Sequence, residues 1–261
     1  MNRFNLCVGG GASRSLKAFT LAEVLITLAI IGVVAALTIP SVITNYRNQE
    51  IETRLKKTFS ILNAAAQMAF KDHGSMVGWD IANPPFTREH AQDFVDKYMA
   101  PYLRIAKNCG ISTTDDCSYD SVCLNNTPSS TFSFRDPYSS RFYLSDGTLL
   151  SVQIGNEDDY PQDRYAAILF DINGHKKPNI VGKDIFYFRY QLIKKGLPDG
   201  SVRPVGSSKQ ANNFAREGNS GYCNTKSWGT FCARAIMNNN WKIPTKEQFV
   251  DLGGNPEHYP W

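Results

Sequence analysis

The sequence predicts an α+β protein in which one long N-terminal helix packs on an antiparallel sheet. Residues 17–40, KAFTLAEVLITLAIIGVVAALTIP, are almost entirely apolar, and helical periodicity resumes after them as far as residue 72. Runs of strand-forming residues separated by turn signals follow from residue 141 onward. The roughly 190 residues after the helix are enough for one domain with its own hydrophobic core.

The apolar run from Phe19 to Ile39 has the length of a membrane span. Its 21 residues form a helix of about 31 Å, which matches the hydrocarbon core of a bilayer. A carboxylate at the bilayer centre costs roughly 2.5–3.5 kcal/mol, whereas the apolar side chains of this run return about 4–7 kcal/mol. Insertion is therefore favoured despite Glu23. The alternatives are a cleaved secretory signal ending near Val34-Ala35-Ala36 and a buried core helix.

The segment Ala18-Phe19-Thr20-Leu21-Ala22-Glu23, followed by the apolar run and Pro40, resembles the prepilin signature of type IV pilins and type II secretion pseudopilins. The resemblance implies that a membrane peptidase cleaves between Ala18 and Phe19 and methylates the new N-terminus of Phe19. The family usually has glycine where this chain has Ala18. The resemblance also implies a pilin-like fold, with the helix as a spine and the sheet in a head whose C-terminal region is stapled by a disulfide.

The resemblance divides the chain into a leader peptide (1–18), a transmembrane or filament-core helix (19–39), an amphipathic continuation of the spine (40–74) and an extracytoplasmic head (75–261). Arg14 and Lys17 are expected to stay on the cytoplasmic side of an inner membrane, so the head would face the periplasm or exterior. The implied partners are other pilin or pseudopilin subunits, the prepilin peptidase, and an assembly platform with its ATPase. The motif leaves open whether the filament serves a pilus, secretion or DNA uptake.

Glu23 and Pro40 are the predicted assembly residues. A carboxylate in an apolar helix needs a counter-charge, and the amine of Phe19 freed by cleavage would lie about 6 Å away along the helix axis. In a filament that amine can belong to a neighbouring subunit, so the pair would set the register between helices. The alternative is that Glu23 simply reaches the cytoplasmic interface. Pro40 has no N–H to bond to the carbonyl of Ala36, so the helix is expected to kink or loosen there.

The second half of the spine is predicted to pack under the head. Gly74 is the expected C-cap that ends the helix. The apolar residues on one helical face are Ile51, Leu55, Phe59, Leu62, Ala65, Ala66 and Ala69.

The head is predicted to contain a short helix and a four-stranded antiparallel meander. Thr87 is the expected N-cap of the helix, which Pro101 would end. Residues 141–145 and 148–154 read as a hairpin, because Asp146-Gly147 between them suits a type I′ turn. Residues 165–172 and 185–193 read as two further strands.

The loop between the last two predicted strands is a candidate calcium site. Oxygen-bearing side chains of Asp171, Asn173, Asn179 and Asp184 surround tight-turn residues, and some pseudopilins have a calcium site in a strand-connecting loop. Asp and Asn also form turns by bonding their own backbone, and the nearby Lys176, Lys177 and Lys183 disfavour a cation. The turn interpretation is the favoured one.

Six cysteines are grouped in a way that suggests disulfides in an oxidising compartment. Cys7 belongs to the leader. Cys223 and Cys232 would close a small C-terminal loop, as in many pilins, and a second pair would form among Cys109, Cys117 and Cys123. A zinc site is disfavoured because the four histidines are scattered without ligand spacing.

Charge and motifs argue against nucleic-acid binding and catalysis. Three of the 28 basic residues lie in residues 1–18, which leaves 25 basic against 24 acidic side chains in the rest of the chain. No GxSxG, Walker or HExxH motif occurs. The expected function is therefore structural, a pilin or pseudopilin subunit, and the protein is expected not to be an enzyme. The alternative is a membrane-tethered or secreted binding module that does not polymerise, such as an adhesin or a calcium-dependent binder.

Overall fold

A computed structural model describes residues 19–79, 87–113, 116–129, 132–157, 160–194, 197–206 and 221–261. Residues up to Tyr46 and residues from Arg47 onward form two compact units, and each is described here by itself. The helices are α1 (Leu21–His73), α2 (Arg88–Phe94), α3 (Cys232–Asn238) and α4 (Lys246–Asp251), with short helical turns at Met76–Gly78, Val95–Met99, Ala100–Tyr102 and Pro256–His258. The strands are β1 (Ile105–Gly110), β2 (Ser121–Val122), β3 (Pro128–Ser129), β4 (Ser140–Leu144), β5 (Leu149–Glu157), β6 (Tyr160–Asp171), β7 (Ile185–Lys194), β8 (Leu197–Pro198) and β9 (Val202–Pro204).

Helix α1 is the predicted long N-terminal helix. It spans 53 residues, begins two residues after the predicted start at Phe19, and continues through Pro40. Its last turn ends at Gly74, whose φ of 69° lies in the left-handed region and whose N–H donates to the carbonyl of Phe70. Glycine adopts this conformation without steric cost, so the predicted C-cap is confirmed.

The second half of α1 buries one face, as its periodicity predicts. Ile51 and Phe59 pack against this core while remaining partly exposed. The fully buried residues of the helix are Leu55, Thr58, Leu62, Ala65, Ala66 and Ala69.

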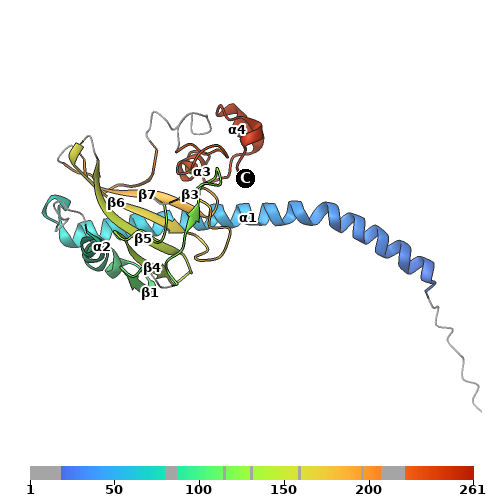
Figure 1. Ribbon diagram of the computed structural model, residues 1–261, viewed down its shortest axis with the longest axis horizontal. Helices are drawn as coiled ribbons and strands as arrows, with labels where there is room; N and C mark the ends of the chain where they lie inside the picture. Colours follow the sequence, from blue (N-terminus) through green and yellow to red (C-terminus); the bar gives the residue numbers. More distant parts are fainter. Residues whose placement is uncertain are drawn as a thin grey trace, which may run out of the picture. The chain divides into compact units, whose positions relative to one another are not determined.

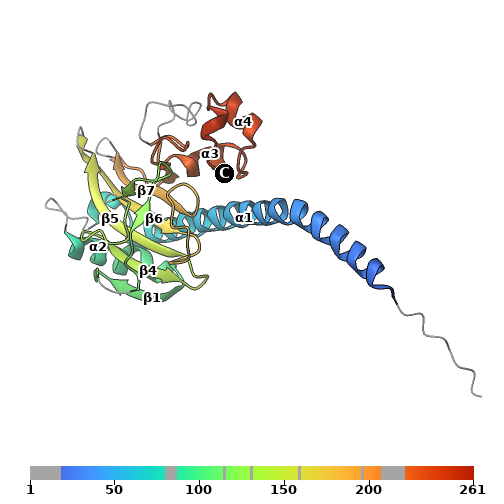
Figure 2. The same cartoon turned by 45° about the vertical axis from the view of Figure 1, so that its right-hand side comes forward.

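Seven of the nine described strands form an antiparallel sheet in the order β1-β4-β5-β6-β7-β8, with β9 pairing β7 beside β8. Strands β2 and β3 form a separate two-stranded sheet. The predicted meander is its centre, since β4, β5, β6 and β7 pair in chain order (Figure 1 and Figure 2). Strand β1 pairs with β4 through two register irregularities, and β8 and β9 have only two and three residues. Strands this short or irregular do not show the alternation of apolar and polar residues by which a strand is predicted from sequence.

The turn between β4 and β5 differs from the predicted type I′ turn. Gly147 has a φ of 86°, but Asp146 is not among the residues with positive φ, and type I′ requires both. The N–H of Gly147 donates to the carbonyl of Leu144, and Asp146 Oδ1 accepts from the N–H of Thr148 at 3.1 Å. The aspartate therefore stabilises the turn through its side chain instead of through a left-handed backbone.

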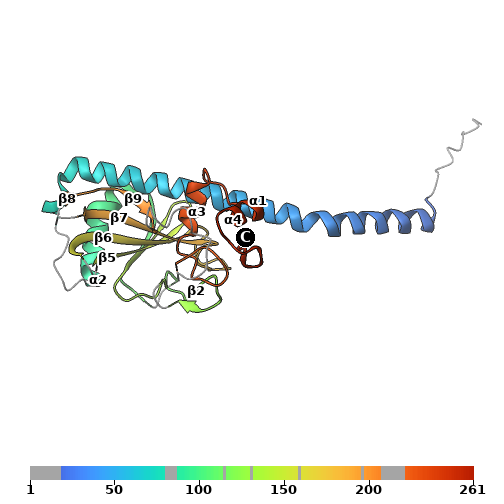
Figure 3. The ribbon, with the colours of Figure 1, turned by 90° about the horizontal axis from the view of Figure 1, so that it is seen from above.

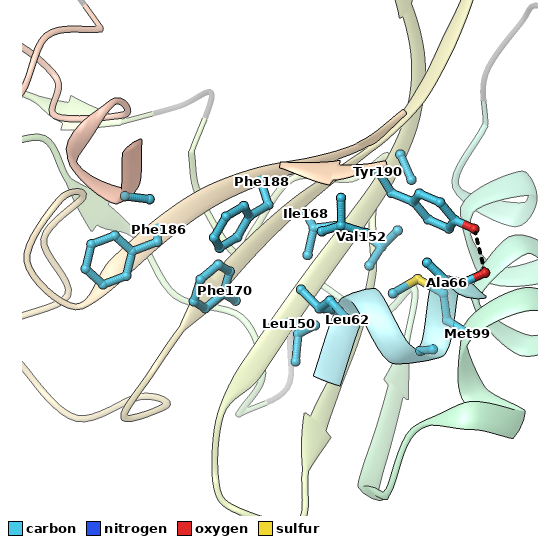
Figure 4. Close-up of a cluster of buried hydrophobic side chains, with 14 of the residues drawn as sticks. Leu62, Ala66, Met99, Leu150, Val152, Ile168, Phe170, Phe186, Phe188 and Tyr190 are labelled. Atoms are coloured by element: carbon cyan, nitrogen blue, oxygen red, sulfur yellow. Dashed lines mark hydrogen bonds between the residues drawn. The ribbon is translucent and has the colours of Figure 1, made fainter. Parts of the chain in front are cut away.

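One face of the sheet packs on α1 and α2, and the opposite face is covered by the segment that contains β2 and β3 (Figure 3). In the α1-facing core, Leu62 and Ala66 lie against Val152, Ile168 and neighbouring side chains of the sheet (Figure 4). The rings of Phe170 and Phe188 stack with centroids 5.1 Å apart. This core joins the helix and the sheet into one folded body within residues 47–261.

The buried Arg141 holds the covering segment on the opposite face. Its Nη1 donates to the carbonyl of Asp136 at 2.9 Å and to Ser139 Oγ at 3.0 Å, and its Nη2 donates to the carbonyl of Ser112. Charge-assisted hydrogen bonds of this kind compensate the cost of burying a guanidinium group.

Helix α2 has the predicted N-cap, and the helical conformation continues past its end at Phe94. Thr87 Oγ1 accepts from the N–H of His90 at 3.3 Å, which is standard capping geometry. The chain stays helical through Met99 and then forms a tighter turn over Ala100–Tyr102 that includes Pro101. Proline is tolerated there because a helical first turn does not need its N–H.

Candidate functional site

The N-terminal half of α1 presents an apolar surface that nothing in its own unit covers. The most hydrophobic window of the helix has a mean hydropathy of 2.4, and none of it is buried. Large side chains such as Leu21, Ile30 and Leu37 are between 59% and 78% exposed. So large an apolar surface requires a bilayer or other helices around it.

Glu23 lies in the first turn of α1 and is held by Thr20. The Thr20 N–H and Oγ1 both donate to Glu23 Oε2, at 2.8 and 2.9 Å, and the N–H of Glu23 donates back to Thr20 Oγ1 at 3.2 Å. This is the reciprocal geometry of a capping box. The Glu23 carboxylate therefore satisfies the N–H of Thr20, and the Thr20 hydroxyl satisfies the N–H of Glu23, two groups at the helix start that a bilayer could not bond.

Sequence reasoning missed the role of Thr20. The signal was present, since Thr20 and Glu23 have the S/T-x-x-E spacing of a capping box directly before an apolar run. A carboxylate that caps its own helix does not need to reach the interface to find a partner.

The hydroxyl groups of this unit also bond within the helix. All four Ser and Thr side chains between Leu21 and Tyr46 donate to a carbonyl three or four residues earlier. Thr44, for example, donates to the carbonyl of Pro40 at 3.0 Å, and Thr38 donates to that of Val34 at 2.9 Å. Such bonds remove exposed donors from the helix surface, which suits an apolar environment.

The predicted cleavage site is only partly visible. Ala18 and the rest of the leader lie outside the described residues. Phe19 is 84% exposed and immediately precedes the N-cap. Pro40 is an interior residue of α1, in the same exposed unit as Glu23.

The structure brings the four candidate calcium residues into one loop and engages their oxygens with the protein. Asp171 Oδ2 accepts from the hydroxyl of Tyr119 at 2.6 Å, and its Oδ1 accepts from the N–H of Asn173 at 2.9 Å. Asp184 accepts from the N–H groups of Asn179 and Ile180, at 2.8 and 2.6 Å. Each carboxylate thus fixes the backbone of the loop, as the turn interpretation predicts.

Burial raises the pKa of both carboxyl groups. Burial raises the pKa of Asp171 to about 8, and the nearby charge of Asp184 adds to this effect. Burial likewise raises the pKa of Asp184 above its ordinary value, although hydrogen bonds from the N–H groups of Ile180 and Asn179 oppose the shift. Two buried acids in one loop therefore favour a protonated state of Asp171 near neutral pH.

These residues do not fit a calcium cage well. Calcium takes six to eight oxygen ligands, whereas all four carboxylate oxygens here already accept N–H or O–H donors. Among the described residues no group of three or more His, Cys, Asp or Glu side chains could hold a metal. Asn179 Oδ1 is buried and accepts no hydrogen bond from the described residues, so it is a side-chain oxygen of the loop that remains open to a cation.

The five described cysteines form two disulfides and leave one thiol free. Cys109 is bonded to Cys117, and Cys223 is bonded to Cys232 at the start of α3. Cys123, the third member of the first cluster, is a buried free thiol. The second disulfide closes a short loop within the C-terminal segment, because its cysteines are nine positions apart. Closing a loop of this size stabilises the fold by about 3 kcal/mol in a chain-entropy model.

An exposed membrane-length helix with a capped carboxylate at its start, followed by an α+β head with two disulfides, defines a pilin-like protein class and is consistent with membrane anchoring. Comparison with known families agrees with this class. Residues 14–39 match the prokaryotic N-terminal methylation motif, so the chain carries the prepilin signal of type IV pilins and pseudopilins.

Residues 41–247 match a family model described as a family of unknown function, DUF6613, and the chain belongs to this family. No curated protein and no solved structure matches the chain.

Proposed function

We propose that this protein is a structural subunit, a pilin or pseudopilin, of a type IV pilus or type II secretion-type filament. The single observation that carries the proposal is the exposed apolar surface of α1 from Phe19 to Tyr46. In the membrane this surface faces lipid, and in a filament it packs against the same helix of neighbouring subunits.

Processing creates the form that assembles. The prepilin peptidase cleaves between Ala18 and Phe19 and methylates the new amine of Phe19. Alanine before the cut is small enough to occupy the place of the usual glycine. The product has an apolar helix whose first charged side chain is Glu23.

Glu23 sets the register between subunits. Within one chain its carboxylate accepts hydrogen bonds from Thr20, which lowers the cost of keeping it in an apolar environment. A carboxylate has further lone pairs, so it can also accept from the Phe19 amine of a neighbouring subunit. Because no other acidic side chain lies between Phe19 and Gln49, only one axial alignment satisfies this amine.

The remaining parts of the chain follow from this role. Residues 1–18 are the leader, residues 19–39 form the membrane or filament core, residues 40–74 continue the spine, and residues 75–261 form the head outside the inner membrane. The partners are other subunits of the filament, the prepilin peptidase, and the assembly platform with its ATPase. The head has a structural role and not a catalytic one.

The mature N-terminus tests the proposal. Mass spectrometry of the native protein should find a chain that starts at methylated Phe19, and the Ala18→Gly variant should be cleaved at least as completely. The mature chain should also sediment with filaments sheared from cells. A native chain that keeps its first eighteen residues, or that starts near Leu37 as a secreted domain, would contradict the proposal and favour a binding module that does not polymerise.

A further inference from the structure

A pocket with a cationic lining lies between the second half of α1 and the turn that follows α3. Both walls belong to the compact unit that starts at Arg47. Its cavity volume is about 390 Å³, which is large enough for a small organic ligand. The lining residues are Glu52, Thr53, Lys56, Lys57, Ser60, Asn240, Trp241 and Lys242.

The pocket offers many hydrogen-bond donors and few free acceptors. Each lysine ammonium group carries three N–H donors. Lys57 forms an ion pair with Asp146, and Lys242 forms one with Glu52, both at 2.8 Å. Lys56 forms no ion pair with any described residue and is exposed. The three ammonium groups therefore retain donors that a ligand could accept.

Both oxygens of the one carboxylate in the lining already accept hydrogen bonds from the protein. Glu52 Oε2 accepts from Lys242 Nζ at 2.8 Å, and its Oε1 accepts from the N–H of Ile243 at 2.9 Å. The Glu52 side chain is only 12% exposed. It fixes the turn to α1 and compensates Lys242, and Asp146 compensates Lys57, so the charge of Lys56 is the one that no described carboxylate balances.

The backbone of the opposite wall is strained where Asn240 and Trp241 line the pocket. Asn240 and Trp241 have φ values of 55° and 63°, and a bulky residue rarely adopts this left-handed conformation. The Trp241 N–H donates to the carbonyl of Ile236, and its ring packs on Phe59 with centroids 5.0 Å apart. Such strain costs on the order of 1–3 kcal/mol and is concentrated at binding sites.

We propose that this pocket binds a phosphate ester. Lysines from two opposing walls suit a compact anion with several oxygens, since a tetrahedral phosphate group accepts hydrogen bonds from many directions and a carboxylate from fewer. The cavity is larger than a phosphate group alone, so the organic part of the ester lies against the half-buried ring of Trp241. The proposal does not depend on filament assembly, because every residue of the site lies in the compact unit that starts at Arg47.

Trp241 provides a local reporter for the test. The chain has four tryptophans, so the full chain labelled with 5-fluorotryptophan in an uncharged detergent gives a small set of ¹⁹F signals, and the Trp241→Phe variant assigns one of them. Inorganic phosphate and glycerol 3-phosphate should shift the Trp241 signal in a saturable manner. Sodium chloride at the same ionic strength should not.

Matched lysine variants separate the pocket from general charge effects. Lys56→Met removes the unpaired ammonium group and keeps a straight side chain with good helix propensity. We expect it to raise the dissociation constant about tenfold, the loss typical of one charge-assisted hydrogen bond. Lys71→Met changes an exposed lysine of α1 that does not line the pocket and should leave the constant unchanged.

A second experiment distinguishes a soluble phosphate ester from a lipid headgroup. A shift with glycerol 3-phosphate in uncharged micelles supports a soluble ester, whereas a shift only after phosphatidylglycerol is added to the micelles supports a lipid headgroup. The proposal is overturned if neither glycerol 3-phosphate nor phosphatidylglycerol gives a saturable shift of the Trp241 signal, or if chloride gives the same shift. It is also overturned if Lys56→Met and Lys71→Met have the same dissociation constant.

Discussion

The hydroxyl group of Tyr190 on β7 donates a hydrogen bond of 3.3 Å to the backbone carbonyl of Ala66 on α1 (Figure 4). Tyr190 is 2% exposed and Ala66 is 3% exposed, so the bond lies within the core that joins the sheet to the helix. Burial raises the pKa of the Tyr190 hydroxyl above its ordinary value, which keeps the group protonated and able to donate. The helix and the sheet are thus joined by a polar contact in addition to apolar packing.

Tyr190→Phe should remove this bond and leave the packing in place. We expect the free energy of unfolding to fall by about 0.5–1.5 kcal/mol, since the Ala66 carbonyl loses a partner that water cannot replace. Urea unfolding of the full chain in uncharged detergent would measure the change. Tyr138→Phe is the matched control, because Tyr138 is 55% exposed. Removing its hydroxyl group should leave the free energy of unfolding unchanged within experimental error.

Leu62→Ala should weaken the same core more strongly. Leu62 is 2% exposed and lies between the helix and the sheet, so its truncation leaves a cavity and should cost about 2–5 kcal/mol. Leu25→Ala makes the same chemical change at a side chain that is 58% exposed in the N-terminal unit. The control should leave the urea midpoint of the head unchanged, and equal effects of the two variants would contradict the packing described here.

The sequence was sufficient to predict elements whose pattern is long and local. The buried face of α1 follows from spacing in a single helix, and β4 to β7 are long enough to show strand composition. Strands β8 and β9 were not predictable, because pairing with β7 over two or three residues depends on tertiary contacts.

In the candidate sites, too, local contacts could be predicted from the sequence and long-range contacts could not. The Thr20–Glu23 cap is local and could have been read from its spacing. By contrast, Tyr119 donates to Asp171 across 52 positions of sequence, and Glu52 accepts from Lys242 across 190. Nothing in the neighbourhood of Asp171 or Glu52 along the chain indicates these partners, since only the folded sheet and helix bring them together.

The stability of the head should fall as the pH rises from about 4 to 8. Asp171 has a pKa of about 8 in the folded protein, against an ordinary value of 3.8. Between these values the folded state holds a proton that the unfolded state has released, so raising the pH favours unfolding. Asp171→Asn should flatten this part of the profile, because its amide stays neutral and can still bond to Tyr119.

Thermal unfolding of the full chain across this pH range would test the prediction. Asp93→Asn changes an exposed aspartate on α2 and should keep the slope of the original protein. A stability that rises between pH 4 and 8 in the original protein, and not in Asp171→Asn, would show that the carboxylate is instead stabilised in its charged form.

Calcium should not stabilise the head. The oxygens of Asp171 and Asp184 already accept donors from the loop, so a cation would have to displace several hydrogen bonds. A specific ligand at one hundred times its dissociation constant would stabilise the folded state by about 2.7 kcal/mol. Thermal unfolding with millimolar calcium, compared with magnesium as a control, should show no such shift. A calcium-specific rise that Asn179→Ala abolishes would restore the metal interpretation.

Two substitutions at Glu23 separate its capping role from its charge. Glu23→Ala removes both, whereas Glu23→Gln keeps an oxygen that can accept from Thr20 but loses the negative charge. Both variants should insert at least as well as the original chain, because an acid at the bilayer centre costs roughly 2.5–3.5 kcal/mol, and both should be cleaved before Phe19.

If the carboxylate pairs with the Phe19 amine of a neighbouring subunit, both variants should be absent from sheared filaments while remaining in the membrane fraction. Normal assembly of Glu23→Gln together with failure of Glu23→Ala would assign the requirement to the helix cap, and normal assembly of both would exclude any role for Glu23 in the register of the filament.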